Sequence, residues 1–324
     1  IWVYTFKGGI KTIIWTDTLQ TIMFLVAMVS TIIYIGSEMD KGVGDLISMI
    51  KESDYSKMFF FDGGWGDPNN FFKQFLAGAL ITIVMTGLDQ DMMQKNLSCP
   101  NIRDAQKNML TMSSILFFVN IIILSLGALL YIYAAQLNIE VPARTDYLYP
   151  TIALHHLPAA VGLTFMLGLI AAAYSSADSA LTALTTSFCV DFLGFDQRSP
   201  HGEKNKKTEP ENRKTRFMVH VGFSVILAIT ILVFNSLNND AVINNLFKAA
   251  GYTYGPLLGL FVFGMFTKIK IKDKLVIPVC LLAPILTWLI VGWSKSSLGF
   301  DWGFLNIALN GAVTMVGLLL IAER

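Results

Sequence analysis

Long uninterrupted apolar runs are the feature that most limits what this chain can fold into. They recur along the sequence, and a run of roughly 18 to 25 residues crosses a hydrocarbon core of about 30 Å as an α-helix. Inside a bilayer every backbone N–H and C=O group must be paired within the protein, which only helices and closed barrels achieve. The alternating pattern of a membrane β-barrel is absent from the sequence. We therefore expect an all-α membrane protein.

Eight runs are long enough to serve as spanning helices. The composition agrees, because 54% of the 324 residues are hydrophobic, 15% are charged and the mean hydropathy is +0.56. The fourth run is too long for one straight crossing, so we expect it to tilt or to extend into the cytoplasm. The predicted spans are residues 12–36, 71–94, 108–135, 153–192, 217–236, 244–267, 275–293 and 302–322.

The charged loops predict the orientation of the chain. Lys and Arg gather in the polar stretch 193–216 and again in 268–274, whereas 37–70 is mainly acidic. Cytoplasmic loops retain positive side chains. We therefore expect 193–216 to be a cytoplasmic loop and 37–70 an extracellular one. The whole chain, 1–324, would form a single multi-pass transmembrane domain in the plasma (inner) membrane, with the lipid bilayer as a partner and no nucleic acid.

Cysteine usage predicts neither a disulfide nor a metal centre. Cys99, Cys189 and Cys280 have no metal-binding or redox spacing. We expect three free thiols, no disulfide and no cofactor.

The segment AAAYSSADSALTALTTSFCVDF, residues 171–192, is unusually polar for its depth in the membrane. On a helix, its small and polar residues fall on one face. Such a face could be a tight helix–helix seam, since small residues let backbones approach. It could also bind a cation, because Asp178 would cost roughly 2.5 kcal/mol or more within a span unless it is paired or part of an ion path. The shared face consists of Ala172, Ser175, Asp178, Ser179, Thr182, Thr186 and Cys189.

A second intramembrane carboxylate lies in GGIKTIIWTDTLQTIMF, residues 8–24. Asp17 stands between Thr16 and Thr18, with Thr21 one turn further along. It could be an interfacial acid stabilised by the helix dipole, or an inward-facing ion ligand. Hydroxyl and carboxylate oxygens suit a hard cation such as sodium.

These motifs resemble the sodium:solute symporter family, which includes the sodium/glucose, sodium/proline and sodium/sialic acid carriers. The segment 171–192 resembles the eighth core helix of the family, LDQDMMQK at 88–95 resembles the polar end of the sixth, and GYTYGPLLGLFVFGMFTK at 251–268 resembles the tenth. The resemblance extends over essentially the whole chain, in order. The family pattern of two glycines, Trp-Thr-Asp and Gln is present as Gly8, Gly9, Trp15, Thr16, Asp17 and Gln20.

The resemblance implies a LeuT-type inverted-repeat bundle. We expect this chain to be the C-terminal part of a longer one, so that the N-terminal helices of the bundle are missing here. It also implies a main sodium site formed by the carbonyl of Ala172 and the hydroxyls of Ser175 and Ser176. The remaining ligands would come from the helices that are missing.

A second cation site is implied at Asp17, Asp178 and Ser179, where Asp178 replaces a hydroxyl of the family pattern. Two carboxylates in one dry site cannot both stay ionised without a cation. We therefore expect sodium and a proton to compete there. The alternative is that a protonated Asp178 bonds to a neighbouring helix as a structural contact.

The resemblance also assigns solute-facing positions. Sugar carriers have an aromatic pair where this chain has Met85 and Thr86, and a glutamine where it has Phe247, followed by Lys248. These departures disfavour a hexose. Lys248 could attract an anionic solute or extend its side chain to the membrane surface.

Gly251, Gly255 and Pro256 are predicted to form an unwound hinge in a gating helix. The functional prediction is a sodium-coupled secondary transporter that imports a small organic solute by alternating access, and not an enzyme. An intramembrane hydrolase is disfavoured because Ser175 and His155 would lie about 30 Å apart along one helix. The alternative is a carrier-like solute sensor within a signalling protein.

Overall fold

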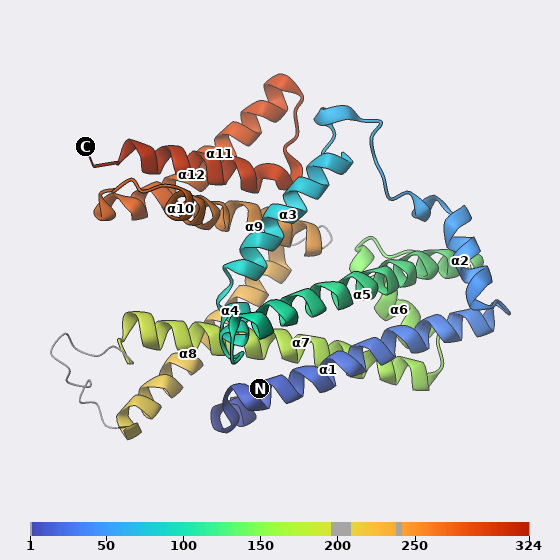
Figure 1. Cartoon of the computed structure of the whole chain (residues 1–324). Coiled ribbons are helices and arrows are strands. Elements are labelled where there is room, and N and C mark those ends of the chain that lie inside the picture. Colours follow the sequence, from blue (N-terminus) through green and yellow to red (C-terminus); the bar gives the residue numbers. More distant parts are fainter. Residues whose placement is uncertain (1, 196–208, 238–241, 324) are drawn as a thin grey trace. The chain divides into compact units, whose positions relative to one another are not determined.

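The computed structural model describes residues 2–195, 209–237 and 242–323, and these residues are almost entirely helical (Figure 1). Within them no β-strand forms, and a single antiparallel bridge joins Ile271 to Ala322. The chain divides into two compact units. Unit 1 comprises residues 1–56 and 94–239, and unit 2 comprises residues 57–93 and 240–324.

The expected all-α membrane fold is confirmed. Seven helices in the described residues are long and apolar enough to cross a membrane, and a bent pair, Val242–Thr253 with Gly255–Phe266, raises the number to eight if it counts as one span. The seven are Asp17–Glu38, Gly64–Gly87, Ile102–Gln136, Ala159–Phe192, Arg213–Ser236, Asp273–Leu298 and Gly303–Leu320.

The predicted fourth run, 153–192, is not one helix. Helix α6, Leu148–His155, ends before Pro158, and α7, Ala159–Ser187, begins after it. Proline lacks an N–H donor and disfavours helical backbone in the residue before it, so the two helices separate there. The run ends in a π-helical turn, Phe188–Phe192. The remaining helix, Ala159–Phe192, still has 34 residues, so the expectation that it tilts or extends beyond the membrane stays a prediction.

The predicted second run, 71–94, is also divided. Helix α3, Phe71–Gly87, is capped by Leu88, and α4, Gln90–Leu97, begins two residues after this cap. The Asp89 carboxylate accepts a hydrogen bond from the backbone N–H of Met92 at 3.2 Å, which is an N-terminal capping contact. The segment LDQDMMQK at 88–95 is polar, but its composition alone does not show whether the helix continues or breaks there.

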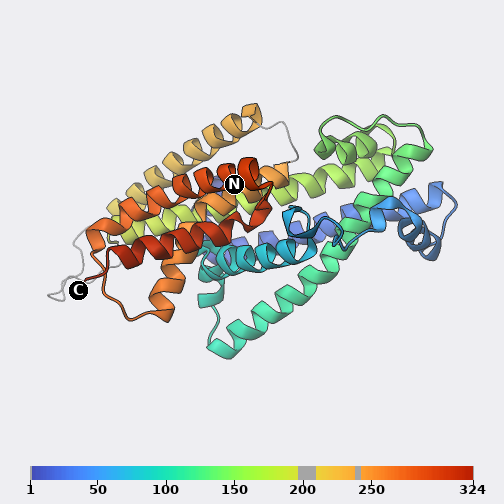
Figure 2. The ribbon, with the colours of Figure 1, turned by 90° about the horizontal axis from the view of Figure 1, so that it is seen from above.

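Unit 1 is built around the pairing of α1, Trp2–Glu38, with α7, and these helices lie side by side (Figure 1 and Figure 2). The pairing is close because Gly168 has no side chain. A Cβ atom there would meet the Ala27 Cβ at 2.8 Å. Helices α5, Ile102–Gln136, and α6 complete the apolar core of this unit, and α8, Glu209–Leu237, packs on α7.

Polar contacts also join the helices of unit 1 at positions distant in sequence from Asp17 and Asp178. The Tyr133 hydroxyl donates to Glu38 at 2.6 Å. The hydroxyls of Ser30 on α1 and Thr164 on α7 lie 3.1 Å apart. The shorter helix α2, Val43–Glu52, follows α1, and Gly42 N–H donates to Asp45 at its first turn.

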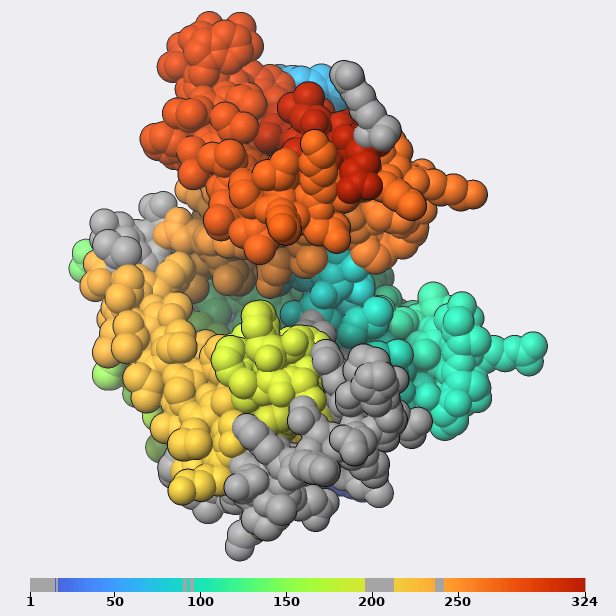
Figure 3. Space-filling model, turned by 90° about the vertical axis from the view of Figure 1, so that its left-hand side faces the viewer, coloured from blue at the N-terminus to red at the C-terminus, as the bar shows by residue number. Residues whose placement is uncertain are grey.

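Unit 2 contains α3, α9 (Val242–Thr253), α10 (Gly255–Phe266), α11 (Val276–Leu298) and α12 (Asn306–Leu320). The side chains of α10, α11 and α12 pack into one body (Figure 3). A second apolar cluster, with Ile81, Val84, Leu258 and Ile307 at its centre, joins α3, α10 and α12.

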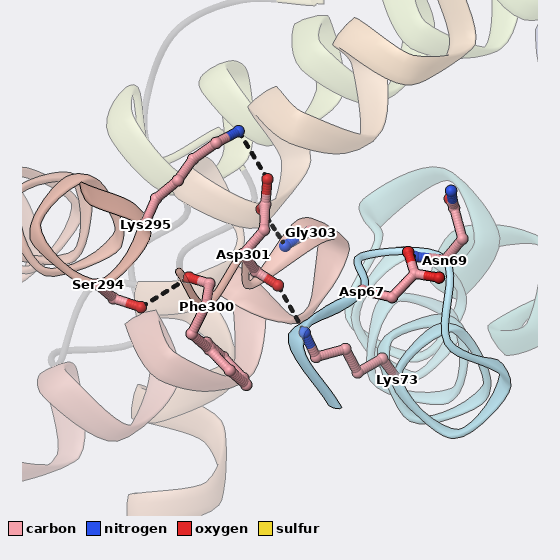
Figure 4. Close-up of polar contacts among 8 residues, drawn as sticks. All are labelled: Asp67, Asn69, Lys73, Ser294, Lys295, Phe300, Asp301 and Gly303. Atoms are coloured by element: carbon pink, nitrogen blue, oxygen red, sulfur yellow. Dashed lines mark hydrogen bonds and ion pairs between the residues drawn. The ribbon is translucent and has the colours of Figure 1, made fainter. Parts of the chain in front are cut away.

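A buried lysine fastens α3 to the loop between α11 and α12 (Figure 4). Lys73 is 1% exposed. Its ammonium group donates to the backbone carbonyl of Asp301 at 2.5 Å and lies 3.9 Å from the centre of the Phe300 ring. The turn before α3 is closed by Asp67, whose carboxylate accepts from the Asn69 N–H at 2.8 Å.

The Asp301 side chain faces away from Lys73 and pairs with Lys295 at 2.7 Å (Figure 4). Burial raises the pKa of Asp301, but hydrogen bonds from Lys295 and from the Gly303 N–H outweigh it, so the pKa lies below its usual range. A carboxyl group with a lowered pKa stabilises the fold at neutral pH, and this contribution is lost as the pH falls through the folded-state pKa.

The three cysteines are free thiols, as predicted.

Candidate ion and solute sites

The two intramembrane carboxylates predicted from sequence lie on the paired helices α1 and α7. The Ser175 hydroxyl donates to the Asp17 carboxylate at 2.7 Å. These residues are 158 positions apart in the chain, so the bond depends on the close α1–α7 packing at Gly168. It brings one residue of each predicted cation site into direct contact.

The neighbouring hydroxyl points to its own helix. Ser176 donates to the Ala172 carbonyl, one turn earlier, at 3.2 Å, a common arrangement for serine in a helix. This places two of the three predicted ligands of the main sodium site, the Ala172 carbonyl and the Ser176 hydroxyl, beside each other. The Ser176 side chain is exposed in this chain.

Asp178 and Ser179 form the most buried polar pair on α7, with exposures of 1% and 7%. Cys189 on the same predicted face is also buried, whereas Thr186 is exposed. The face is therefore partly a packed seam. A buried carboxylate without compensation is costly, and Asp178 takes part in an electrostatic interaction with His220 of α8.

Two further polar groups lie near this seam: His220, which was not singled out from the sequence, and Gln20, which was named as part of the motif without a role. His220 is 8% exposed, its Nδ1 lies 3.1 Å from the Thr185 hydroxyl, and its Nε2 has no hydrogen-bond partner in the described residues. Gln20 belongs to the Trp-Thr-Asp motif, and its buried Oε1 also lacks a partner there. A lone histidine in an apolar run carries no spacing signal, but the position of Gln20 one turn after Asp17 does.

The oxygen-rich chemistry of this region fits an alkali cation. The Asp17 carboxylate and the Ser175 hydroxyl meet between α1 and α7, the Ala172 carbonyl and the Ser176 hydroxyl lie within one turn of Ser175, and the buried Gln20 Oε1 has no partner in the described residues. Within the described residues no group of three or more His, Cys, Asp or Glu side chains could hold a metal ion. A transition-metal site would need nitrogen or sulfur ligands.

The predicted solute-facing residues are partly brought together within unit 2. Met85 of α3 and Phe247 of α9 both pack against the second apolar cluster, and the Phe247 ring lies 5.5 Å from that of Phe304. Thr86 is half-buried next to Met85. The Lys248 side chain is exposed.

The predicted hinge coincides with a break in the helix. Helices α9 and α10 meet at Tyr254 with a bend of 43°. Pro256 lies in the first turn of α10, where its missing N–H is tolerated. The Asn310 amide of α12 donates to the carbonyls of Gly251 and Tyr252, at 3.1 Å and 2.8 Å. Asn310 was not singled out from the sequence.

Known proteins with similar sequences are sodium symporters. The sodium/sialic acid symporter NanT of Aliivibrio fischeri is 26% identical, over 98% of this chain and 61% of its own length. The sodium/sialic acid symporter SiaT of Proteus mirabilis is 25% identical, over 82% of this chain and 53% of its own length. The chain thus spans about 61% or less of these curated relatives.

A solved structure has the same fold. It is described as the substrate-bound outward-open state of a Na⁺-coupled sialic acid symporter with a novel Na⁺ site, and it matches with a TM-score of 0.73 at 19% identity, covering all of this chain and 66% of its own. The LeuT-type fold expected from the sequence is therefore confirmed.

The match to a family model shows which protein family the chain belongs to. Residues 1–272 match the Sodium:solute symporter family, a family of transporters, and the match includes both carboxylate-bearing helices and the broken helix. None of the related proteins favours the solute-sensor alternative. This chain is therefore a member of the sodium:solute symporter family.

Proposed function

We propose that the protein containing this chain is a sodium-coupled secondary transporter that imports a small organic solute by alternating access. The observation that carries the proposal is the hydrogen bond between Ser175 and Asp17, which joins the two ion-binding motifs across α1 and α7. Sodium would bind an outward-open state, stabilise the helices that hold the solute, and leave with it on the inner side. No cofactor is required beyond the ion.

The main sodium site in this proposal includes the Ala172 carbonyl and the hydroxyls of Ser175 and Ser176. The second cation site consists of Asp17, Asp178 and Ser179. Support comes from the 3.2 Å contact between Ser176 and Ala172, and from the burial of Asp178 and Ser179 on the same helix.

Sialic acid is the first solute to test, because the relatives NanT and SiaT are named for it. The solute would lie against Met85, Thr86, Phe247 and Lys248. We expect the complete protein in proteoliposomes to accumulate labelled solute only with an inward sodium gradient. A panel of sialic acid, other carboxylates, amino acids, sugars and vitamins identifies the substrate. Equal uptake with potassium replacing sodium for every solute would reject the proposal.

Removal of the ligand hydroxyls is expected to weaken apparent sodium affinity. In the complete protein, Ser175→Ala or Ser176→Ala removes one oxygen ligand and retains a small residue that suits a helix. We expect the sodium concentration for half-maximal uptake to rise at least about fivefold, which corresponds to the loss of roughly one weak interaction. The solute KM at saturating sodium should change less.

Ser30→Ala is the matched control for this measurement. It removes a hydroxyl from the same helix pair, at the Ser30–Thr164 contact outside the proposed site. Sodium dependence that is unchanged in both Ser175→Ala and Ser176→Ala, or altered equally in Ser30→Ala, would contradict the assignment.

The proposed orientation in the plasma membrane gives a separate prediction. Residues 37–70 should be extracellular and residues 193–216 cytoplasmic, although 196–208 lie outside the described residues. In a background without Cys99, Cys189 and Cys280, single cysteines in each loop are treated with a membrane-impermeant thiol reagent. Only the 37–70 cysteine should react in sealed, right-side-out cells. Reaction at 193–216 would reverse the orientation.

A further inference from the structure

Three glycines on the broken helix face three polar side chains of α12, and α10 and α12 run side by side (Figure 1). In each case a Cβ atom on the glycine would lie less than 3.0 Å from the α12 residue at the same level. The pairs are Gly251 with Asn306, Gly255 with Asn310, and Gly259 with Thr314. This register continues across the break at Tyr254, so α12 follows both halves of the helix.

The break exposes carbonyl groups that need donors. A helix end leaves its last carbonyls without intrahelical partners, and burying them unpaired is unfavourable. Asn310 is fully buried, and its amide nitrogen donates to both Gly251 and Tyr252, in the last turn of α9. Its own Oδ1 has no partner in the described residues. The position of this side chain is therefore determined by its two donor contacts.

The two halves of the broken helix are held differently. Helix α12 packs chiefly along α10 and less along α9, and Gly259 lies against both the Thr314 side chain and the Gly311 carbonyl. At the break, the Asn310 side chain donates hydrogen bonds that join α9 to α12. Hydrogen bonds of this kind are individually modest, so they can open and re-form during a conformational cycle.

We propose that Asn310 is a positioning residue that latches the last turn of α9 onto α12, so that α10 stays with α12 while α9 moves. The inference rests on the proposed transport cycle and adds to it which half of the gating helix moves and which residue holds it. Breaking the latch should favour the conformation in which α9 has left α12. In this proposal the two hydrogen bonds shift a conformational equilibrium, and Asn310 itself binds neither solute nor ion.

The test follows opening directly, by the reactivity of a cysteine on α9. Phe247 is half-buried against Phe304, so Phe247→Cys in a cysteine-free background of the complete protein should become more reactive when α9 moves. Asn310→Asp keeps the shape but replaces the two N–H donors with acceptors that repel the carbonyls. We expect the labelling rate with a small impermeant maleimide to rise about tenfold, since two hydrogen bonds are lost.

Thr314→Val is the matched control. Thr314 is equally buried on α12, but its hydroxyl donates only to the Asn310 carbonyl of its own helix, at 2.9 Å. We expect its labelling rate to stay within about twofold of the parent. If Asn310→Asp does not fold, Asn310→Ser replaces it as the test variant. Serine is short and cannot reach both carbonyls, so we expect an intermediate increase in the labelling rate.

Unchanged labelling in every folded Asn310 variant, or an equal increase in Thr314→Val, would overturn the latch. This outcome is separate from failure of the proposed function. A protein that shows no sodium-driven uptake would reject the transport proposal, yet the Asn310-dependent change in labelling would still be measurable.

Discussion

Asp178→Asn is expected to lower the number of sodium ions transported per solute from two to one. The substitution keeps the shape of a side chain that is 1% exposed on α7 but removes the charge that would hold a second cation. Asp17→Asn should do the same, because Asp17 lies on the opposite helix and is bonded to Ser175 at 2.7 Å. Reversal potentials in proteoliposomes report the charge moved per solute and so measure this change.

The expected pH dependence follows from the same chemistry. A carboxylate that gains a proton no longer attracts sodium, and two carboxylates in one dry site hold protons more readily when the cation is absent. Coupling should therefore weaken as the pH falls in the unmutated protein. In the two asparagine variants the coupling should be less sensitive to pH.

Asp191→Asn is the matched control on the same helix segment. Asp191 is exposed and accepts a hydrogen bond from Ser187 at 2.6 Å, so its neutralisation should leave the stoichiometry unchanged. A value of one sodium per solute in the unmutated protein and in both variants, with no pH dependence, would eliminate the second site. Asp178 would then be a structural contact on the face that packs towards α8.

The spanning helices could be predicted from sequence because their signal is local. An apolar run of sufficient length has few alternatives in a bilayer, and the predicted spans overlap the observed ones throughout. The breaks were harder to place. The break at Pro158 follows from proline chemistry, but the end of α3 at Gly87 depends on Asp89 capping the next helix.

The candidate site shows the same division between local and long-range information. Ser175 and Asp17 were predicted because each belongs to a dense polar motif. His220 and Asn310 are single polar residues in apolar runs, and their significance arises only when another helix packs against them. Sequence periodicity can place such a residue on a face but cannot identify the neighbouring helix.

Lys73 is another isolated polar residue of this kind, and Lys73→Glu is expected to destabilise the protein strongly. The ammonium group of Lys73 donates to the Asp301 carbonyl and stacks on Phe300. A glutamate there would place a carboxylate against a carbonyl and an aromatic face, with no donor. Leaving a buried charge without a partner costs about 3–5 kcal/mol, so the apparent Tm in detergent should fall by several degrees.

Two further variants separate the charge from the packing. Lys73→Met keeps the apolar stem and buries no charge, so it should lose only the interactions of the ammonium group and be less destabilised than Lys73→Glu. Lys295→Met removes a lysine from the same cluster, but that side chain is exposed and its pairing with Asp301 is a surface ion pair, so little change is expected. If Lys73→Glu unfolded at the same temperature as Lys295→Met, the Lys73 side chain would have to be solvated.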